Sequence, residues 1–336
     1  MKRIVLLAAA AVLLCSLLAS CGKEKVPVTS GETTTEITET DLKVPTADYG
    51  GHTFNFLSAG YITYNDFDFD EESSLALDNA QYKRRRLVEE NYKVEIHEDI
   101  KQAYSSGGGP GFMQISTDVS AGVCSYDLAL IAGYDVSVLA YSGLLYDLNS
   151  VPGIDLSKSW WDQKANKDLS IRGRMFYTTG DISVVDNMVT HALLFNKDMI
   201  ESYGLDNPYD LVAVDNWNLE TFGALVKQVG QDLDNNGVYD ENDLYGLLTW
   251  NDPMTAILAA AGEKIATIND RGELTLTLYN ERVVNLYDTF EGIVFDQAHA
   301  FNYQYDNTTG KASPSKVWNT NRDALFNGNR AVFYLN

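Results

Sequence analysis

Cysteine and histidine are scarce in this chain, which has 3 cysteines and 4 histidines among 336 residues. Two of the cysteines lie in or directly after an apolar N-terminal run, so Cys124 is left alone in the rest of the chain. A lone thiol excludes a framework of intramolecular disulfides, and we expect Cys124 to be buried as a small apolar side chain. No histidines have the spacing of a zinc site; they are His52, His97, His191 and His299.

Basic residues are also few, because 25 lysines and arginines are outnumbered by 47 aspartates and glutamates, and the formal net charge is -22. Electrostatic repulsion therefore argues against nucleic acid, anionic lipid and anionic substrates as partners. The 20 tyrosines, 13 phenylalanines and 5 tryptophans suit neutral polar ligands such as sugars, whose apolar faces stack on aromatic rings. An acidic composition is also a common way for a protein to stay soluble, so both interpretations are open.

The N-terminus has the order of a secretory signal peptide. Lys2 and Arg3 precede an almost wholly apolar run that is short for a membrane-spanning helix. The run ends in Leu18-Ala-Ser-Cys21, which resembles the bacterial lipobox, in which the cysteine is lipidated. We expect Cys21 to carry acyl chains that attach the mature chain to the outer face of a membrane; an incidental cysteine is the alternative. The next residues, to about Asp48, are rich in Thr and Glu without apolar periodicity and predict a flexible stalk.

An acidic loop at residues 232–243 places oxygen-bearing side chains in the pattern of an EF-hand calcium loop. Gly237 stands sixth, where the chain must turn sharply. A hard cation such as Ca²⁺ needs about six to eight oxygen ligands, so we predict a structural calcium site. The expected ligands are side chains of Asp232, Asp234, Asn236, Asp240 and Asp243 and the carbonyl of Val238. A solvated acidic turn is the alternative, since the last position holds Asp in place of the longer Glu.

The rest of the chain alternates short apolar strands with helical segments. This alternation predicts an α/β fold with a parallel sheet. Arg84, Arg85 and Arg86 lie in one predicted helix, 75–92, and we expect them to face solvent largely. Strands are predicted at 53–57, 92–96, 126–132, 174–178, 190–195, 245–249, 274–278 and 330–335.

Ligands of such sheets bind beyond the carboxyl ends of the strands. Sugars require carboxylates or amides for their hydroxyl groups and an aromatic face beneath the ring. Trp250, next to Asn251 and Asp252, is the best local match, although a tryptophan that caps the core is an equal alternative. The candidate ligand-binding residues at strand ends are Tyr61, Tyr134, Asp135, Asp181, Trp250 and Asp252, and no catalytic residues are predicted.

Several motifs occur together in a characteristic order. They are Leu18-Ala-Ser-Cys21, Tyr126-Asp-Leu-Ala129, Ser142-Gly-Leu-Leu-Tyr-Asp-Leu148, Phe195-Asn-Lys197, Trp217 before Leu219-Glu-Thr-Phe222, the acidic loop before Tyr245-Gly246, and Leu325-Phe-Asn-Gly-Asn-Arg-Ala-Val332. Each motif is weak alone. In this order, over roughly residues 50–336, the chain resembles the carbohydrate-type extracellular solute-binding proteins of bacterial ABC importers.

The resemblance implies a two-lobed periplasmic-binding-protein-like (type II) fold, with parallel or mixed sheets flanked by helices and a ligand cleft between the lobes. It implies a signal peptide at 1–20, a stalk at 21–48, a first lobe at 49–149, a second at 150–330, and a hinge crossing that starts at 331–336. Family members continue beyond this point, so the resemblance implies a C-terminally truncated chain. We expect a lipid-anchored monomer on the extracellular face of the membrane that delivers a carbohydrate to ABC permease subunits.

Three other functions are open at this point. A secreted glycoside hydrolase would use two converging carboxylates, which the abundant Asp and Glu permit, although the lipobox and stalk favour a receptor. A surface scaffold of the dockerin type would use the calcium loop for adhesion, but such modules duplicate the loop. A receptor for a peptide or an amino acid differs from the first prediction only in its ligand.

Overall fold

The computed structural model describes residues 47–335, with the exception of 61–64, 70–71, 103–106 and 305–314. The predicted signal peptide, Cys21, the stalk as far as residue 46, and Tyr61 lie outside the described residues. Residues 48–336 group into one compact unit. Within the part described, no helix is both long and apolar enough to span a membrane.

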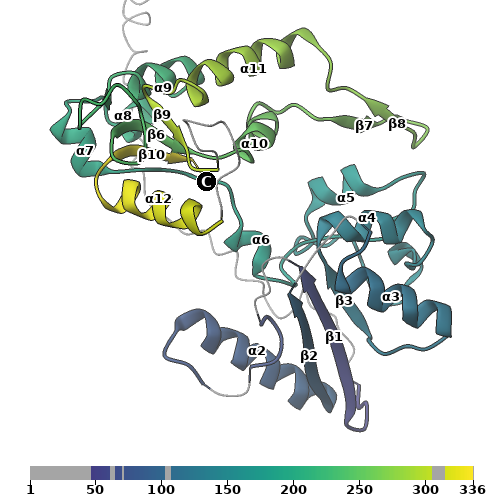
Figure 1. Ribbon diagram of the computed structural model, residues 1–336. Coiled ribbons are helices and arrows are strands. Elements are labelled where there is room, and N and C mark those ends of the chain that lie inside the picture. Colours follow the sequence, from purple (N-terminus) through teal and green to yellow (C-terminus); the bar gives the residue numbers. More distant parts are fainter. Residues whose placement is uncertain (1–46, 61–64, 70–71, 103–106, 305–314, 336) are drawn as a thin grey trace, which may run out of the picture. The chain divides into compact units, whose positions relative to one another are not determined.

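The first sheet is parallel, with strand order β2-β1-β3 (Figure 1). Its strands are β1 (His52–Gly60), β2 (Val94–Gln102) and β3 (Leu128–Ile131), and the helices between and after them are α2 (Ala76–Tyr92), α3 (Pro110–Ala121) and α4 (Gly133–Tyr141). Strand pairing sets Phe56 beside both Glu98 and Leu128, so these three side chains share one face. The predicted α/β class, with parallel and mixed sheets flanked by helices, is confirmed.

Each face of the first sheet has its own cover. Phe56 and Ile96 form an apolar cluster with Phe67, and Val88 of α2 packs against it. The opposite face carries Ala59, which α3 approaches through Gly111. Covering both faces explains why the predicted strand at 126–132 is almost continuously apolar.

Residues 148–184 are mostly irregular and contain η1 (Leu148–Ser150) and α5 (Gln163–Leu169). The predicted strand at 174–178 is absent; Arg174 forms only an isolated bridge with Ile171. Ile182 packs against the first apolar cluster, and the amide of Val184 donates a 3.0 Å hydrogen bond to Asp66. These contacts place residues 182–184 against the first sheet; the lobe boundary at 149 stays a prediction.

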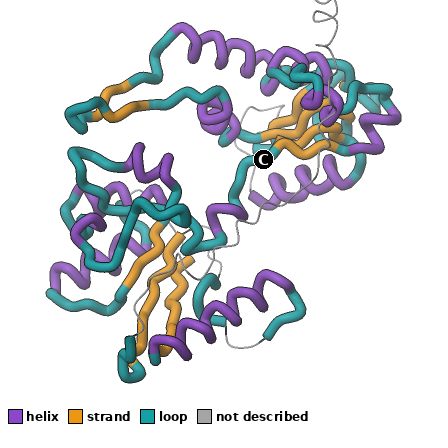
Figure 2. The backbone as a smooth tube through the Cα atoms, turned by 180° about the vertical axis from the view of Figure 1, so that it is seen from behind, coloured by secondary structure: helices purple, strands orange, loops and turns teal. Residues whose placement is uncertain are grey.

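The second sheet is mixed, with strand order β4-β10-β6-β5 and β9 also paired with β6. Figure 2 shows its strands as a tight group. Its strands are β4 (Leu193–Phe195), β5 (Gly230–Gln231), β6 (Leu244–Thr249), β9 (Ala300–Asn302) and β10 (Ala331–Leu335). β10 runs parallel to β6 and antiparallel to β4. The segment predicted to begin a hinge crossing is therefore an interior strand of this sheet.

Helices pack around the second sheet, and many begin at an asparagine. Asn196, Asn218 and Asn280 each accept a hydrogen bond from a backbone amide of the first turn, which satisfies a donor that the helix itself cannot pair. The elements of this part are α6 (Val185–Met188), α7 (Lys197–Ser202), α8 (Pro208–Ala213), α9 (Leu219–Val226), α10 (Pro253–Ala260), α11 (Glu281–Val294) and α12 (Ser315–Asn327), with a separate hairpin of β7 (Ala266–Ile268) and β8 (Leu274–Leu276).

Two expectations about single side chains are wrong. Cys124 is exposed, and its thiol donates a 3.3 Å hydrogen bond to the carbonyl of Tyr126. It follows the C-terminus of α3, where the chain turns through Gly122 at the surface. Arg84 and Arg85 turn back toward the sheet, because buried or half-buried carboxylates lie there; Arg86 is the more exposed of the three.

Replacement of Gly111 by alanine should destabilise the first sheet. A Cβ at Gly111 would lie 2.6 Å from the Cβ of Ala59 and 2.8 Å from Cδ1 of Ile131, so α3 would be pushed off the strands. We expect Gly111→Ala to lower the free energy of unfolding in urea by about 1–3 kcal/mol. The matched control is Gly133→Ala, where a Cβ meets nothing within 4 Å and stability should hold or rise slightly. Equal stability of the two variants would contradict the close approach.

Candidate functional site

A cluster of polar side chains lies where β6 and β9 end. These strands are parallel, with Thr249 paired to Asn302, so their carboxyl ends meet at one edge of the sheet. Asn251 and Gln304 follow the two strands directly. We call Asn251, Asn302 and Gln304 the amide cluster.

Hydrogen bonds join the members of the amide cluster. The side-chain amide of Asn302 donates to Oδ1 of Asn251 at 3.1 Å, and the backbone amide of Gln304 donates to Oδ1 of Asn302 at 3.0 Å. The backbone amide of Asn251 donates to Oε1 of Gln304 at 3.1 Å. These hydrogen bonds join the three residues into one group, and a side-chain amide carries both donors and acceptors.

Trp250 lies beside this cluster and is half-buried. Its ring stacks on Tyr303, with the centroids 6.2 Å apart and the planes at 16°. The indole Nε1 is buried and has no hydrogen-bond partner among the described residues. Burial raises the pKa of Tyr303 well above its ordinary value, so this phenol stays neutral. Trp250 thus packs one face on the core, as one of the two interpretations of the sequence predicts.

Asp252 completes this part of the candidate site. Its side chain is exposed at the start of α10, and its carbonyl accepts the amide of Thr255 at 2.8 Å. The structure therefore brings Trp250 and Asp252 together on one turn after β6. Asn302, Tyr303 and Gln304 were not predicted from the sequence, although the run Phe-Asn-Tyr-Gln at 301–304 has the same pattern of a strand followed by an amide that marked Trp250.

The candidates beside the first sheet have different surroundings. The side chain of Tyr134 is 62% exposed. Asp135 is only 2% exposed, and its Oδ1 accepts amides from Gly107, Gly108 and Gly109 at 3.0, 3.3 and 3.3 Å. This carboxylate holds the glycine loop before α3, a structural contact that the sequence did not indicate. Asp181 is exposed, and its backbone amide donates to Trp160.

The acidic loop brings three of its predicted ligands together. Oxygen atoms of Asp232, Asp234 and Asp243 lie within 4.8 Å of one another. Gly237 has the positive φ of 79° that the predicted turn requires, and its amide donates to Asp232 at 2.8 Å. This hydrogen bond is the main cause of the lowered pKa of Asp232. Carboxylate oxygens are the ligands that Ca²⁺ prefers, so the donor set fits that ion.

The other predicted ligands also belong to this loop. Asp243 is fully buried, and its two carboxylate oxygens accept the amides of Leu233 and Asp240, each at 2.8 Å. Oδ1 of Asp240 accepts the amide of Asn242. Oδ1 of Asn236 accepts the amide of Val238 at 2.6 Å. The loop is therefore folded by its own side chains, and the predicted calcium site stays a prediction.

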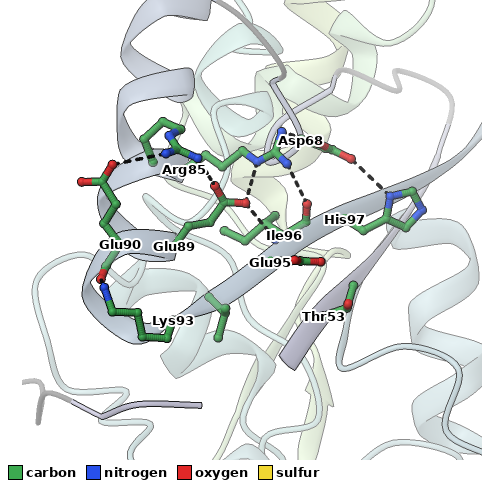
Figure 3. A pocket seen from close by; sticks show the side chains of 11 residues that line it. Thr53, Asp68, Arg85, Glu89, Glu90, Lys93, Glu95, Ile96 and His97 are labelled. Carbon is green, nitrogen blue, oxygen red and sulfur yellow. Dashed lines mark hydrogen bonds and ion pairs between the residues drawn. The ribbon is translucent and has the colours of Figure 1, made fainter. Parts of the chain in front are cut away.

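A charged pocket of about 690 Å³ lies between α2 and β2 (Figure 3). Arg85 and Glu89 of α2 reach the edge of β2 at Ile96, where Glu89 accepts the amide at 3.0 Å and Arg85 donates to the carbonyl at 3.2 Å. The two side chains also pair with each other at 3.0 Å. These side chains occupy the backbone amide and carbonyl of Ile96, with which an additional strand would pair. Arg85 and Glu89 therefore protect β2, the edge strand of the first sheet, from further strand pairing.

Comparison with known proteins identifies the family of this chain. Residues 83–334 match the model of the bacterial extracellular solute-binding protein family, and the chain belongs to that family. Its members are binding proteins, so the prediction that the chain is not an enzyme is confirmed. No curated protein sequence matches the chain.

Two solved structures of ABC transporter binding proteins are similar to this chain. One is a substrate-binding protein of Listeria monocytogenes in complex with cycloalternan, at 13% identity and a TM-score of 0.43, covering 85% of this chain and 61% of that one. The other is the galacto-N-biose-/lacto-N-biose I-binding protein of Bifidobacterium longum in complex with lacto-N-biose, at 14% identity and a TM-score of 0.47, covering 86% of this chain and 60% of that one. The chain thus spans about three fifths of the length of each.

The ion pair at the edge of β2 gives a pH-dependent prediction. Burial raises the pKa of Glu89, but the Ile96 amide and the guanidinium groups of Arg85 and Arg86 outweigh burial and hold this pKa below its ordinary value. A carboxylate with a lowered pKa stabilises the fold above its unfolded-state pKa and loses that contribution as the pH falls through the folded-state value. We expect Glu89→Gln to lower the free energy of unfolding by about 1–2 kcal/mol at pH 7. This difference between the variant and the parent protein should shrink as the pH falls.

Urea unfolding of both proteins across the acid range would measure this gap. The control is Glu90→Gln, since Glu90 is exposed and pairs only at the surface with Arg86; its effect should stay within about 0.5 kcal/mol. A Glu89→Gln gap that is the same at every pH would contradict the role of the charge.

Proposed function

We propose that this extracellular solute-binding protein captures a neutral sugar or oligosaccharide at the carboxyl ends of β6 and β9. The observation that supports this ligand class is the amide cluster beside Trp250. Side-chain amides both donate and accept hydrogen bonds, as sugar hydroxyl groups do, and an aromatic ring offers an apolar face to the pyranose. Asp252, exposed on the same turn, would accept from a pair of hydroxyl groups.

A non-sugar solute such as a peptide is the second candidate. The family admits solutes in general, and side-chain amides also recognise peptide backbone groups. The net charge of -22 makes an anionic solute unfavourable under either proposal. The neutral character of the amide cluster favours an uncharged polyhydroxyl ligand over a charged amino acid.

We further propose that the chain is lipid-anchored through Cys21 and passes its solute to the permease of an ABC importer as a monomer. The support for the anchor is the sequence Leu18-Ala-Ser-Cys21 after an apolar run. A stalk after the lipid would let the binding domain move above the membrane surface. Delivery to a permease follows from the resemblance of the motif order to importer receptors.

The acidic loop is proposed to bind Ca²⁺ in a structural role. Asp232, Asp234 and Asp243 would supply carboxylate oxygens, with Asn236, Asp240 and the carbonyl of Val238 as further ligands. A divalent cation would neutralise charges that otherwise repel one another at the start of β6. No step of solute binding is assigned to the metal.

Removal of one amide from the cluster should weaken sugar binding. Asn302→Ala leaves Asn251 and Gln304 without their shared partner, so we expect the Kd for a bound oligosaccharide to rise about tenfold or more in calorimetric titration. Asn285→Ala, at an exposed position on α11, is the control and should leave Kd unchanged. The panel should include neutral oligosaccharides and peptides. Binding of a peptide and of none of the sugars would overturn the proposed ligand class.

Calcium should raise the melting temperature of the protein independently of any sugar. At a hundredfold excess over Kd, a metal that binds only the folded state stabilises it by about 2.7 kcal/mol. The double variant Asp232→Asn and Asp234→Asn should lose this shift, whereas Asp288→Asn, exposed on α11, should keep it. A melting temperature that is identical with calcium and with chelator would identify the loop as a plain acidic turn.

A further inference from the structure

A buried polar network lies under the first sheet and involves none of the predicted ligand residues. Glu98 of β2 is buried and accepts a hydrogen bond from the hydroxyl of Ser58 on β1. Its other oxygen accepts the backbone amides of Asp66 and Phe67 at 2.9 and 2.8 Å. The carboxylate therefore fixes the loop that contains Asp66 and Phe67 to both strands.

Asp66 extends this network to α2. Its side chain is 2% exposed, and its Oδ1 accepts hydrogen bonds from Gln81 at 2.7 Å and from Arg84 at 3.1 Å. Arg84 also donates to the backbone carbonyl of Asp66 and lies over the ring of Phe67, 5.2 Å from its centroid. A buried carboxylate with these partners is costly to release, because its charge would then be left uncompensated.

The same two residues hold a segment that is far away in the sequence. Oδ2 of Asp66 accepts the backbone amide of Val184 at 3.0 Å, and Arg84 donates to the carbonyl of Ile182 at 3.4 Å. The side chain of Ile182 packs against the apolar cluster of the first sheet. The chain is thus attached to the first sheet, by side chain and by backbone, as far as Val184.

The attachment ends soon after this point. Residues 187–192 are all exposed, and the hydrogen bonds described for them run to neighbours such as Asp186 and Val185. Attachment resumes at β4, where Leu193 pairs with Leu335 of the second sheet. We call residues 187–192 the pivot segment. Among the described residues, it lies between the last contact with the first sheet, at Val184, and the first strand of the second sheet, β4.

We propose that Asp66 and Arg84 anchor the connection between the two sheets, so that bending of this connection is confined to the pivot segment. The backbone amide of Asp181 already donates to the carbonyl of Trp160, so without the anchor the connection would be loose from about residue 182. The anchor shortens this loose stretch by holding Ile182 and Val184. A short pivot reduces the conformations that the two sheets can adopt and thereby the entropy that any closing step must overcome. This inference does not depend on the identity of the solute.

Residue-resolved amide hydrogen exchange of the full mature chain tests the anchor. In the parent protein the Val184 amide should be protected more strongly than the amides of the pivot segment, whose hydrogen bonds are only local. Asp66→Ala removes the acceptor, so exchange at Val184 should become about tenfold faster or more, with amides of β1 changing less than about twofold. Arg84→Met should give a smaller increase at the same amide. Arg86→Met, which removes only pairs with Glu89 and Glu90, is the control and should have no effect.

Measured distances between the two sheets distinguish an anchoring role of Asp66 from a general effect on stability. Spin labels placed on the exposed positions Ser120 of α3 and Asp288 of α11, in a Cys124→Ser background, report the spread of distances between the two sheets. Asp66→Ala should broaden this distribution and Arg86→Met should not. The proposal is overturned by unprotected Val184 in the parent protein, by an unchanged distribution in the variant, or by exchange that rises equally in β1. Arg84→Met provides the same test if Asp66→Ala does not fold.

Discussion

Burial of β6 is the constraint on which the second sheet depends. All six of its residues are buried, and it is paired to β10 on one side and to β9 on the other, both parallel. A Cβ at Gly246 would lie 2.0 Å from the carbonyl of Val226, so the strand can approach α9 only because this residue is glycine. The parallel pairing sets the carboxyl ends of β6 and β9 at one edge, where the amide cluster and Trp250 lie. The acidic loop enters the opposite end of the same strand, so one buried strand positions both candidate sites.

Carboxylates have a different function beside the first sheet. Asp66, Glu98 and Asp135 are all buried, and each accepts hydrogen bonds from backbone amides of a loop. Backbone amides compensate much of the cost of burying such charges, and at Asp66 the guanidinium of Arg84 adds to them. This explains how a chain with few basic residues can bury acidic ones. It also means that an abundance of Asp and Glu says little about ligand binding, since the most buried carboxylates hold loops in place.

The parts of the fold that the sequence predicts are those with local signals. β1, β2 and β3 have apolar runs that are long enough to be recognised, and Gly237 marks the turn of the acidic loop. β9 was missed because it has only three residues, Ala300–Asn302, and its stability comes from pairing with β6. The strand predicted at 174–178 did not form. Gly173, with a φ of 73°, turns the chain back so that Arg174 bridges only to Ile171.

The candidate sites, too, could be predicted only where the signal in the sequence is local. Spacing alone predicted that Asp232, Asp234 and Asp243 gather, because a loop of this length can bring its own residues together. The environments of Arg84 and Asp135 could not be predicted, because they depend on partners that only the tertiary fold supplies. Asp135 follows a strand, as a ligand-binding residue would, yet its charge is taken up by the amides of a glycine loop some 26 residues earlier.

Internal hydrogen bonds shape the acidic loop. Asp243 is fully buried without a cation among the described residues near it, and the amides of Leu233 and Asp240 satisfy its oxygens. Tyr245 of β6 donates its phenol to the carbonyl of Asp240 at 2.7 Å, which ties the end of the loop to the core. These hydrogen bonds fix the backbone conformation of the loop but leave oxygens of three carboxylates within 4.8 Å of one another. The electrostatic repulsion between these carboxylates is not removed by the hydrogen bonds. In the proposed calcium site, a bound cation would relieve this repulsion and would compete with the amides of Leu233 and Asp240 for the oxygens of Asp243.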